Sequence, residues 1–192
     1  MNTDQKYKAV VIGSSAGGLA ALSAILEKLP SSFPLPIIVV QHRVKDQRDL
    51  LEEVLQSKCS LKVKQADEKE SIVEGFVYTA PPDYHLLIEK EHEFSLASDE
   101  YVNFSRPSID VLFESAAFAY RQNLIAIILT GANSDGSNGI VAVKKAGGVT
   151  IAQDPQEARY PAMPLAAIKT NAINYIWPLL QIQNYLMKLS PL

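Results

Sequence analysis

Hydrophobic positions in the first 60 residues alternate between short continuous runs and helical repeats. The run at 7–13, YKAVVIG, ends in glycine, and apolar residues then recur at helical spacing over 19–28. A second run at 35–41, LPIIVVQ, is followed by an amphipathic pattern over 46–56. Short buried runs of this kind are typical of strands, and the repeats that follow them are typical of helices. Two successive strand–helix units predict a parallel sheet.

The pattern changes between about residues 60 and 105. Short strand-like pieces, separated by Gly, Pro and charged turns, occupy 61–66, 75–80, 85–90 and 93–98. Such spacing is typical of strands joined by tight turns. We therefore expect an antiparallel excursion in this region.

The last third returns to alternating elements. A helical pattern over 108–122 precedes a strand at 124–131, a helix over 135–148 and a strand at 149–153, and short helical pieces follow from 164. The whole predicts an α/β fold: a doubly wound, mainly parallel sheet with flanking helices and an antiparallel β insertion. No linker or low-complexity tract interrupts it, so we expect 1–192 to form a single domain.

Composition excludes several classes of function. A net charge of −3 without dense Lys or Arg clusters argues against nucleic acid as a partner. One cysteine, Cys59, and a polar start predict a reducing, cytoplasmic location, and no apolar run is long enough for membrane insertion. Three histidines without metal-ligand spacing predict no metal site, and we expect no cofactor.

The first predicted strand leads into Gly13-Ser14-Ser15-Ala16-Gly17, which matches G-x-S-x-G between a strand and a helix. This context favours Ser15 as a nucleophile, with the Ala16 amide among the donors for an oxyanion. Dinucleotide and P-loop sites are disfavoured because the chain lacks their further glycine, acidic and lysine positions. The alternative is that Ser15 only caps a helix.

Functional groups in open α/β sheets gather at the carboxyl ends of strands. There the second predicted strand delivers His42, and the strand at 124–131 leads to Asp135. A neutral imidazole can take the proton of a serine hydroxyl, and a buried carboxylate can orient that imidazole. The sequence therefore predicts a Ser15–His42–Asp135 triad, although His42 could be a surface residue and Asp135 a helix N-cap.

Several ordered motifs resemble the catalytic domain of the CheB family, the chemotaxis receptor protein-glutamate methylesterases. They are VVIGSSAGG (10–18), VVQHR (39–43), YTAPPDYHLL (78–87), SRPSIDVLFESAA (105–117), ILTGANSDGSNG (128–139), AGGVTIAQD (146–154) and AMPLAAI (162–168). The resemblance spans nearly the whole chain. It implies hydrolysis of γ-glutamyl methyl esters on helical cytoplasmic segments of methylated receptors, with glutamine deamidation in some members, and places nucleophile, base and acid on Ser15, His42 and Asp135.

The chain departs from the family pattern at three points. Ala132-Asn133 replaces Met-Gly, so Ala132 becomes the oxyanion donor that the resemblance implies, and Ser105 stands where members commonly carry His. Arg106 could line the cleft and meet acidic receptor groups, or form a structural ion pair. The family's N-terminal receiver domain is not in this sequence, which leaves constitutive access, a separate regulatory receiver protein or a fragment as alternatives.

Two other functions remain open at this point. One is a related serine esterase or amidase outside chemotaxis, suggested by Ala132-Asn133 and the missing receiver. The other is a noncatalytic binding module that keeps the cleft without turnover.

Overall fold

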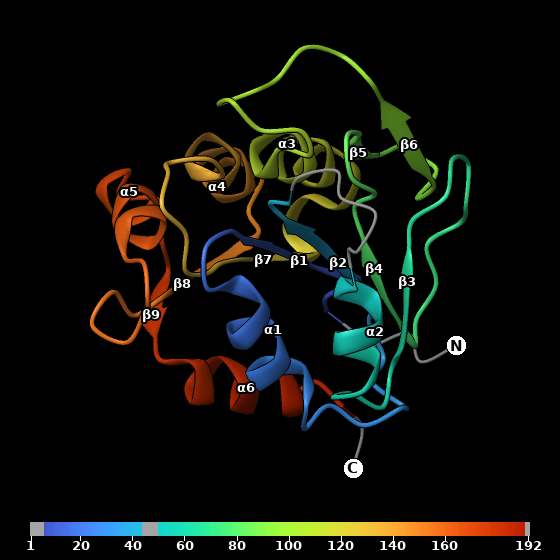
Figure 1. Ribbon diagram of the computed structural model, residues 1–192, viewed down its shortest axis with the longest axis horizontal. Coiled ribbons are helices and arrows are strands. Elements are labelled where there is room, and N and C mark those ends of the chain that lie inside the picture. The colour runs from blue at the N-terminus through green and yellow to red at the C-terminus, as the bar shows by residue number, and fades with distance from the viewer. Residues whose placement is uncertain (1–5, 44–49, 191–192) are drawn as a thin grey trace.

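The computed structural model describes residues 6–43 and 50–190, and its centre is one parallel sheet. Within those residues the sheet has seven strands in the order β3-β4-β2-β1-β7-β8-β9, and every neighbouring pair is parallel (Figure 1). A separate antiparallel pair, β5-β6, lies beside α3 (Figure 1). The strands are β1 (Ala9–Ser14), β2 (Ile37–Gln41), β3 (Lys62–Gln65), β4 (Phe76–Thr79), β5 (His85–Ile88), β6 (Phe94–Ala97), β7 (Leu124–Ile128), β8 (Val149–Gln153) and β9 (Tyr175–Trp177).

Helices cover both faces of the sheet. In Figure 1, α3, α4 and α5 lie on one face, and α1, α2 and α6 lie on the other. This arrangement confirms the predicted doubly wound α/β fold. The helices are α1 (Gly18–Leu26), α2 (Leu51–Gln56), α3 (Ile109–Tyr120), α4 (Ser137–Lys145), α5 (Ala162–Lys169) and α6 (Leu179–Met187), with a short 3₁₀ turn, Arg121–Asn123, after α3.

The two-residue period of the strands divides the core between these layers. In β1, Ala9 and Val11 pack into the cluster under α3, α4 and α5, whereas Val10 and Ile12 pack into the cluster under α1, α2 and α6. Because β1 is covered on both faces, all its residues are buried. This double burial explains why its sequence is a continuous apolar run rather than an alternating one.

The winding reverses direction between β1 and β7. From β1 the chain builds outward through β2 to β4 and β3, then returns to the other side of β1 and builds β7, β8 and β9. In open α/β sheets, ligands bind outside the carboxyl ends of the strands at such a reversal. The fold therefore points to the loops that follow β1 and β7.

The expectation for the region 60–105 was wrong in part. β3 and β4 join the main sheet and pair in parallel, with Lys62 opposite Phe76, and only β5 and β6 form an antiparallel hairpin. Residues 66–75 carry the chain back across the sheet, which allows β3 and β4 to run in the same direction. In a four-residue strand, the alternation of apolar and polar residues shows which side chains are buried. It does not show whether the neighbouring strand runs parallel or antiparallel.

Some other elements also differ from the expectation. β9 forms an edge strand in a region where we predicted only helical pieces. The helix expected over 46–56 is present as α2, and its predicted residues 46–49 lie outside the described part of the chain.

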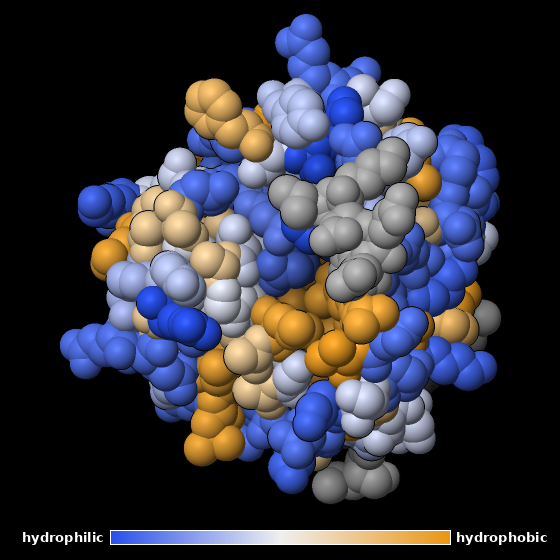
Figure 2. All heavy atoms as spheres, in the orientation of Figure 1, coloured by the Kyte–Doolittle hydropathy of each residue, from blue (hydrophilic) through white to orange (hydrophobic). Residues whose placement is uncertain are grey.

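On the face shown in Figure 2, hydrophilic side chains surround a hydrophobic area between α1 and α2. No helix in the described ranges is long and apolar enough to span a bilayer.

Candidate active site

Three loops meet at the carboxyl edge of the central strands. β1 and β2 pair in register up to Ser14 and Gln41, and the amide of His42 donates to the Ser14 carbonyl at 2.9 Å. On the other side of β1, the Ser15 amide donates to the Thr130 carbonyl at 3.0 Å. The first residues beyond β1, β2 and β7 are therefore neighbours, as the strand-end argument predicts.

The two serines of the turn after β1 have different surroundings. Ser14 is fully buried, and its hydroxyl donates to Gln41 Oε1 at 2.8 Å. Gln41 Nε2 then donates to the Ser15 carbonyl at 2.9 Å, which ties the turn to β2. Gly17 adopts φ 78°, and a Cβ on Gly18 would collide with the Gln41 and Ser14 side chains. The backbone conformation at Gly17 and the packing at Gly18 thus favour glycine at both positions.

The Ser15 side chain is half-buried and is not used by the fold. Within residues 6–43 and 50–190, its hydroxyl makes no hydrogen bond. The N-cap of α1 is Gly17 and has no side-chain cap, so the helix-cap interpretation of Ser15 is not observed. Catalytic hydrogen bonds are often long before substrate binds, so an unbonded hydroxyl is compatible with a nucleophile.

His42 and Asp135 form a close, largely buried pair. His42 Nε2 lies 2.7 Å from Asp135 Oδ2, and the exposed fractions of the two side chains are 12% and 0%. A carboxylate can only accept, so in this pair Nε2 carries the proton and the neutral imidazole keeps its lone pair on Nδ1. Nδ1 faces Asn133 Nδ2 at 3.4 Å and Ser105 Oγ at 3.5 Å. These contacts hold His42 in a defined orientation, so it is not placed freely on the surface.

Asp135 sits at the N-terminus of α3 rather than capping α4. The N-cap of α4 is Gly136, which has no side-chain cap. Backbone amides at the start of α3 point at the carboxylate, where the helix dipole also favours a negative charge. Besides His42, the donors to Asp135 are Ile109 N (2.7 Å), Ser108 Oγ (2.9 Å), Asn103 Nδ2 (2.9 Å), Gly136 N (3.0 Å) and Asp110 N (3.2 Å).

These contacts set the charge of Asp135. Burial opposes its ionisation, but hydrogen bonds from His42, Asn103 and Ile109 more than offset the burial and hold its pKa below the ordinary value. The neighbouring Asp110 behaves in the opposite way, since burial, together with the charge of Asp135, raises its pKa. Environments that separate the pKa values of two adjacent acids are typical of active sites.

The Asn103 amide bridges the two acids, a role that the sequence did not reveal. Asn103 Nδ2 donates to Asp110 Oδ2 at 2.8 Å and to Asp135 Oδ1 at 2.9 Å. Ser108 was missed as well, although a serine immediately before a helical repeat is a recognisable N-cap signal. Its hydroxyl donates to Asp135 instead of capping its own helix.

We expect Asn103→Ala to lower the free energy of unfolding by about 1–3 kcal/mol at neutral pH, because two buried acceptors lose a donor. A carboxyl whose folded pKa is depressed stabilises the fold above its unfolded pKa, about 3.9, and this contribution is lost as the pH falls through the folded pKa. In the variant the ionised Asp135 carboxylate contributes less to the free energy of unfolding. The difference in this free energy between the variant and wild type should therefore shrink below about pH 4. Urea titrations between pH 3 and 7 measure this.

Asn138→Ala is the matched control, because Asn138 Nδ2 donates to Asp110 (3.2 Å) but not to Asp135. It should not reproduce the pH dependence seen with Asn103→Ala. A destabilisation by Asn103→Ala that stays constant from pH 3 to 7 would contradict the assigned role.

Two amides near Ser15 have unused donors. In the described part of the chain, the N–H groups of Ala16 and Ala132 make no hydrogen bond with protein atoms. Ala132 is itself an exposed residue. Unpaired N–H groups of this kind can donate hydrogen bonds to a developing oxyanion.

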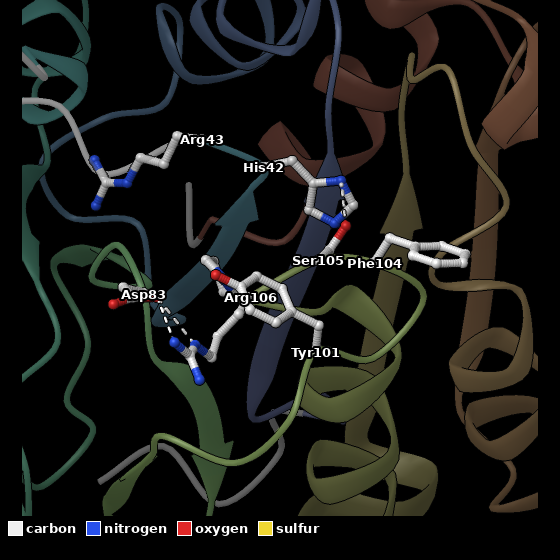
Figure 3. A pocket seen from close by; sticks show the side chains of 8 residues that line it. His42, Arg43, Asp83, Tyr101, Phe104, Ser105 and Arg106 are labelled. Atoms are coloured by element: carbon white, nitrogen blue, oxygen red, sulfur yellow. Dashed lines mark hydrogen bonds and ion pairs between the residues drawn. The ribbon is translucent and has the colours of Figure 1, made fainter.

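A cleft of about 550 Å³ opens beside His42 (Figure 3). Ser15 is not among its lining residues, which are His42, Arg43, Asp83, Tyr101, Phe104, Ser105, Arg106 and Pro107. Arg106 lines this cleft as expected, but its Nη2 donates to Asp83 Oδ1 at 2.6 Å and its Nη1 to the Ser98 and Asp99 carbonyls. These contacts favour the structural ion pair over a free contact for receptor acids.

Comparisons with known proteins agree on one family. A family model described as CheB methylesterase matches residues 10–186. The crystal structure of the Thermotoga maritima CheB methylesterase catalytic domain superposes with a TM-score of 0.91 at 38% identity, covering 95% of this chain and 98% of that one.

Named relatives extend this agreement. A Leptospira interrogans protein, provisionally named protein-glutamate methylesterase/protein-glutamine glutaminase, is 48% identical over 96% of this chain and 95% of its own length. An Archaeoglobus fulgidus protein named protein-glutamate methylesterase/protein-glutamine glutaminase is 36% identical to this chain. The match covers 93% of this chain but only 52% of the Archaeoglobus protein. The family model, the fold and the relatives together establish that this chain belongs to the CheB methylesterase family.

Proposed function

We propose that the chain is a protein-glutamate methylesterase that hydrolyses γ-glutamyl methyl esters of chemotaxis receptors, with Ser15 as nucleophile, His42 as base and Asp135 as the orienting acid. The observation that carries the proposal is the 2.7 Å contact between His42 and a fully buried Asp135, directly beside the end of β1. Burial of a charge is costly unless it is paired and hydrogen-bonded. The His42 amide is bonded to the carbonyl of Ser14, the residue before Ser15, and a histidine–carboxylate pair held so firmly in this position suits acyl transfer.

In the first half of the reaction, Nδ1 of His42 takes the proton of Ser15 as the hydroxyl oxygen attacks the ester carbonyl. Asp135 keeps the proton on Nε2 and stabilises the imidazolium that forms. The amides of Ala16 and Ala132 donate to the carbonyl oxygen, which becomes negative in the tetrahedral intermediate. Collapse of this intermediate breaks the bond to the methoxy group, and His42 returns its proton, so that methanol leaves.

Water completes the cycle in the second half. His42 removes a proton from water, the hydroxide attacks the glutamyl-serine ester, and the Ser15 oxygen leaves with the proton that His42 returns. The products are a free glutamate side chain and the regenerated serine. The same steps on glutamine would release ammonia, which matches the second activity in the relatives' names. No step requires a cofactor.

The partners follow from this substrate. Methylated glutamates on receptor cytoplasmic helices place the reaction in the cytoplasm, at a membrane-bound substrate that this chain would reach without inserting into the bilayer.

The direct test is methanol release from receptor membranes carrying labelled methyl esters. Wild-type protein should release labelled methanol in proportion to time and enzyme. Membranes whose receptors have been demethylated beforehand are the control, and they should yield none.

The two alternatives predict other results. An esterase or amidase outside chemotaxis would leave methylated receptors intact while a fluorophosphonate probe still labels its serine. A noncatalytic binding module would give neither methanol nor labelling. Either result would overturn the proposed methylesterase function.

A further inference from the structure

A tight turn at residues 102–105 projects from the loop between β6 and α3 (Figure 1). The Val102 amide donates to the Ser105 carbonyl at 3.2 Å, and the Ser105 amide donates to the Val102 carbonyl at 2.9 Å. The two central residues, Asn103 and Phe104, have φ angles of 51° and 60°. A two-residue loop with both φ values positive corresponds to a type I′ turn, which favours Asn followed by Gly.

Asn103 suits this turn, but Phe104 does not. A bulky residue with positive φ is a strained outlier, whereas glycine adopts that conformation at little cost. Burial of the Phe104 side chain does not offset this strain, because the side chain is 99% exposed. Neither the backbone nor the core therefore accounts for phenylalanine at this position.

The turn is held in place from both ends. On one side, Asn103 is bonded to Asp110 and Asp135, the acids at the base of the active site. On the other side, Arg106 is bonded to Asp83 and to two backbone carbonyls of the same loop. Strained residues persist where the surroundings fix them in this way, and they cluster at functional sites.

Phe104 is presented at the entrance to the active site. It lines the same cleft as His42 and Ser105, and Figure 3 shows its side chain starting next to Ser105, with the ring extending outward, away from His42. Asn103, the residue before Phe104, donates a hydrogen bond to Asp135, and the carboxylate of Asp135 orients His42. A substrate that brings an ester to His42 from this cleft would therefore meet the Phe104 ring.

We propose that Phe104 is a specificity-determining residue, whose ring packs against an apolar side chain of the substrate helix close to the methylated glutamate. The inference rests on the proposed function, because the occupant is the methylated receptor helix. On a helix, side chains three and four positions apart lie on one face, so an apolar neighbour of the glutamate faces the enzyme with it. Rigid aromatic side chains at the centre of a contact are frequent binding anchors.

The test compares Phe104→Gly with wild type on methylated receptor membranes and on p-nitrophenyl acetate, a small ester that carries no helix to contact the Phe104 ring. On receptors we expect KM to rise by about 10-fold, the size of effect that loss of one aromatic anchor gives, with kcat nearly unchanged. On p-nitrophenyl acetate, kcat/KM should stay within about twofold. Because glycine relieves the strained φ, the Tm should stay the same or rise by about 2–4 °C.

Phe104→Tyr and Phe104→Asn separate contact from turn geometry. Tyrosine keeps the ring and should retain the wild-type KM for receptors. Asparagine tolerates positive φ but has no ring, so it should behave like glycine.

Each contrary result has its own meaning. An unchanged KM in Phe104→Gly overturns the inference alone, as does an equal loss on both substrates, which would show that the turn only positions the active site. Wild-type protein that leaves methylated receptors intact overturns the proposed function, and the inference with it.

Discussion

Ser15→Ala is expected to lower kcat for methanol release by about 10⁴-fold or more, because it removes the hydroxyl that we propose forms the acyl-enzyme. The Ser15 hydroxyl makes no hydrogen bond in the described structure, so its removal should change the free energy of unfolding by less than about 0.5 kcal/mol. Turnover at saturating methylated receptor, together with a urea titration, measures both quantities.

Ser14→Ala is the matched control for this prediction. It removes the neighbouring hydroxyl, which is buried and donates to Gln41. Loss of one such hydrogen bond costs about 1 kcal/mol, so its effect on turnover should be less than about 10-fold. If Ser14→Ala abolished turnover and Ser15→Ala did not, the assignment of the nucleophile would be wrong.

Asp135→Asn is expected to lower kcat by about 10⁴-fold, because a neutral amide does not stabilise the His42 imidazolium and its NH₂ group, when turned toward His42, favours the tautomer with the proton on Nδ1. It should also destabilise the fold by at least about 2 kcal/mol, because donors face both carboxylate oxygens. Oδ2 accepts from His42 and Ile109, and Oδ1 accepts from four further donors, Asn103 Nδ2, Ser108 Oγ, Asp110 N and Gly136 N. Whichever way the asparagine is turned, its NH₂ group meets another donor.

A control must separate the catalytic loss from the lost stability. Leu186→Ala removes a fully buried side chain of α6, in the cluster on the α1 side of the sheet. It should cost about 2–5 kcal/mol of stability and leave kcat nearly unchanged when both proteins are assayed well below their Tm. Asp135→Asn protein that is folded and keeps more than about a tenth of wild-type kcat would refute the role of Asp135.

The meeting of the three strand ends could be predicted from the sequence because it depends on a general rule. Parallel strands deliver their carboxyl ends to one edge, so a serine after β1, a histidine after β2 and an aspartate in the loop after β7 must meet there. His42 and Asp135 are 93 positions apart and still lie 2.7 Å from each other. Continuous apolar runs identified these central strands, which are covered on both faces.

Edge elements could not be predicted in the same way. β9 has only three residues, two of them exposed, so neither periodicity nor burial distinguishes it from a loop. β3 and β4 are four-residue strands whose direction depends on a crossover at 66–75 and on pairing with β2. Their direction is decided by tertiary pairing rather than by local pattern.

The contacts around Asp135 were also beyond sequence reasoning. Asn103 lies 32 positions from Asp135, in a loop without periodic pattern, and nothing local distinguishes it from an ordinary turn asparagine. Phe104 would pass as a residue of the same loop. Its positive φ and full exposure become visible only when the turn is seen in three dimensions.

The most direct test of the central claim is to map the site at which a fluorophosphonate probe reacts, by mass spectrometry of the labelled peptides. Such probes react with activated serines, so the adduct should lie on Ser15, be absent from Ser14, disappear in Ser15→Ala and form much more slowly in His42→Ala. An adduct on Ser14, or labelling of Ser15 at the same rate without His42, would contradict the account.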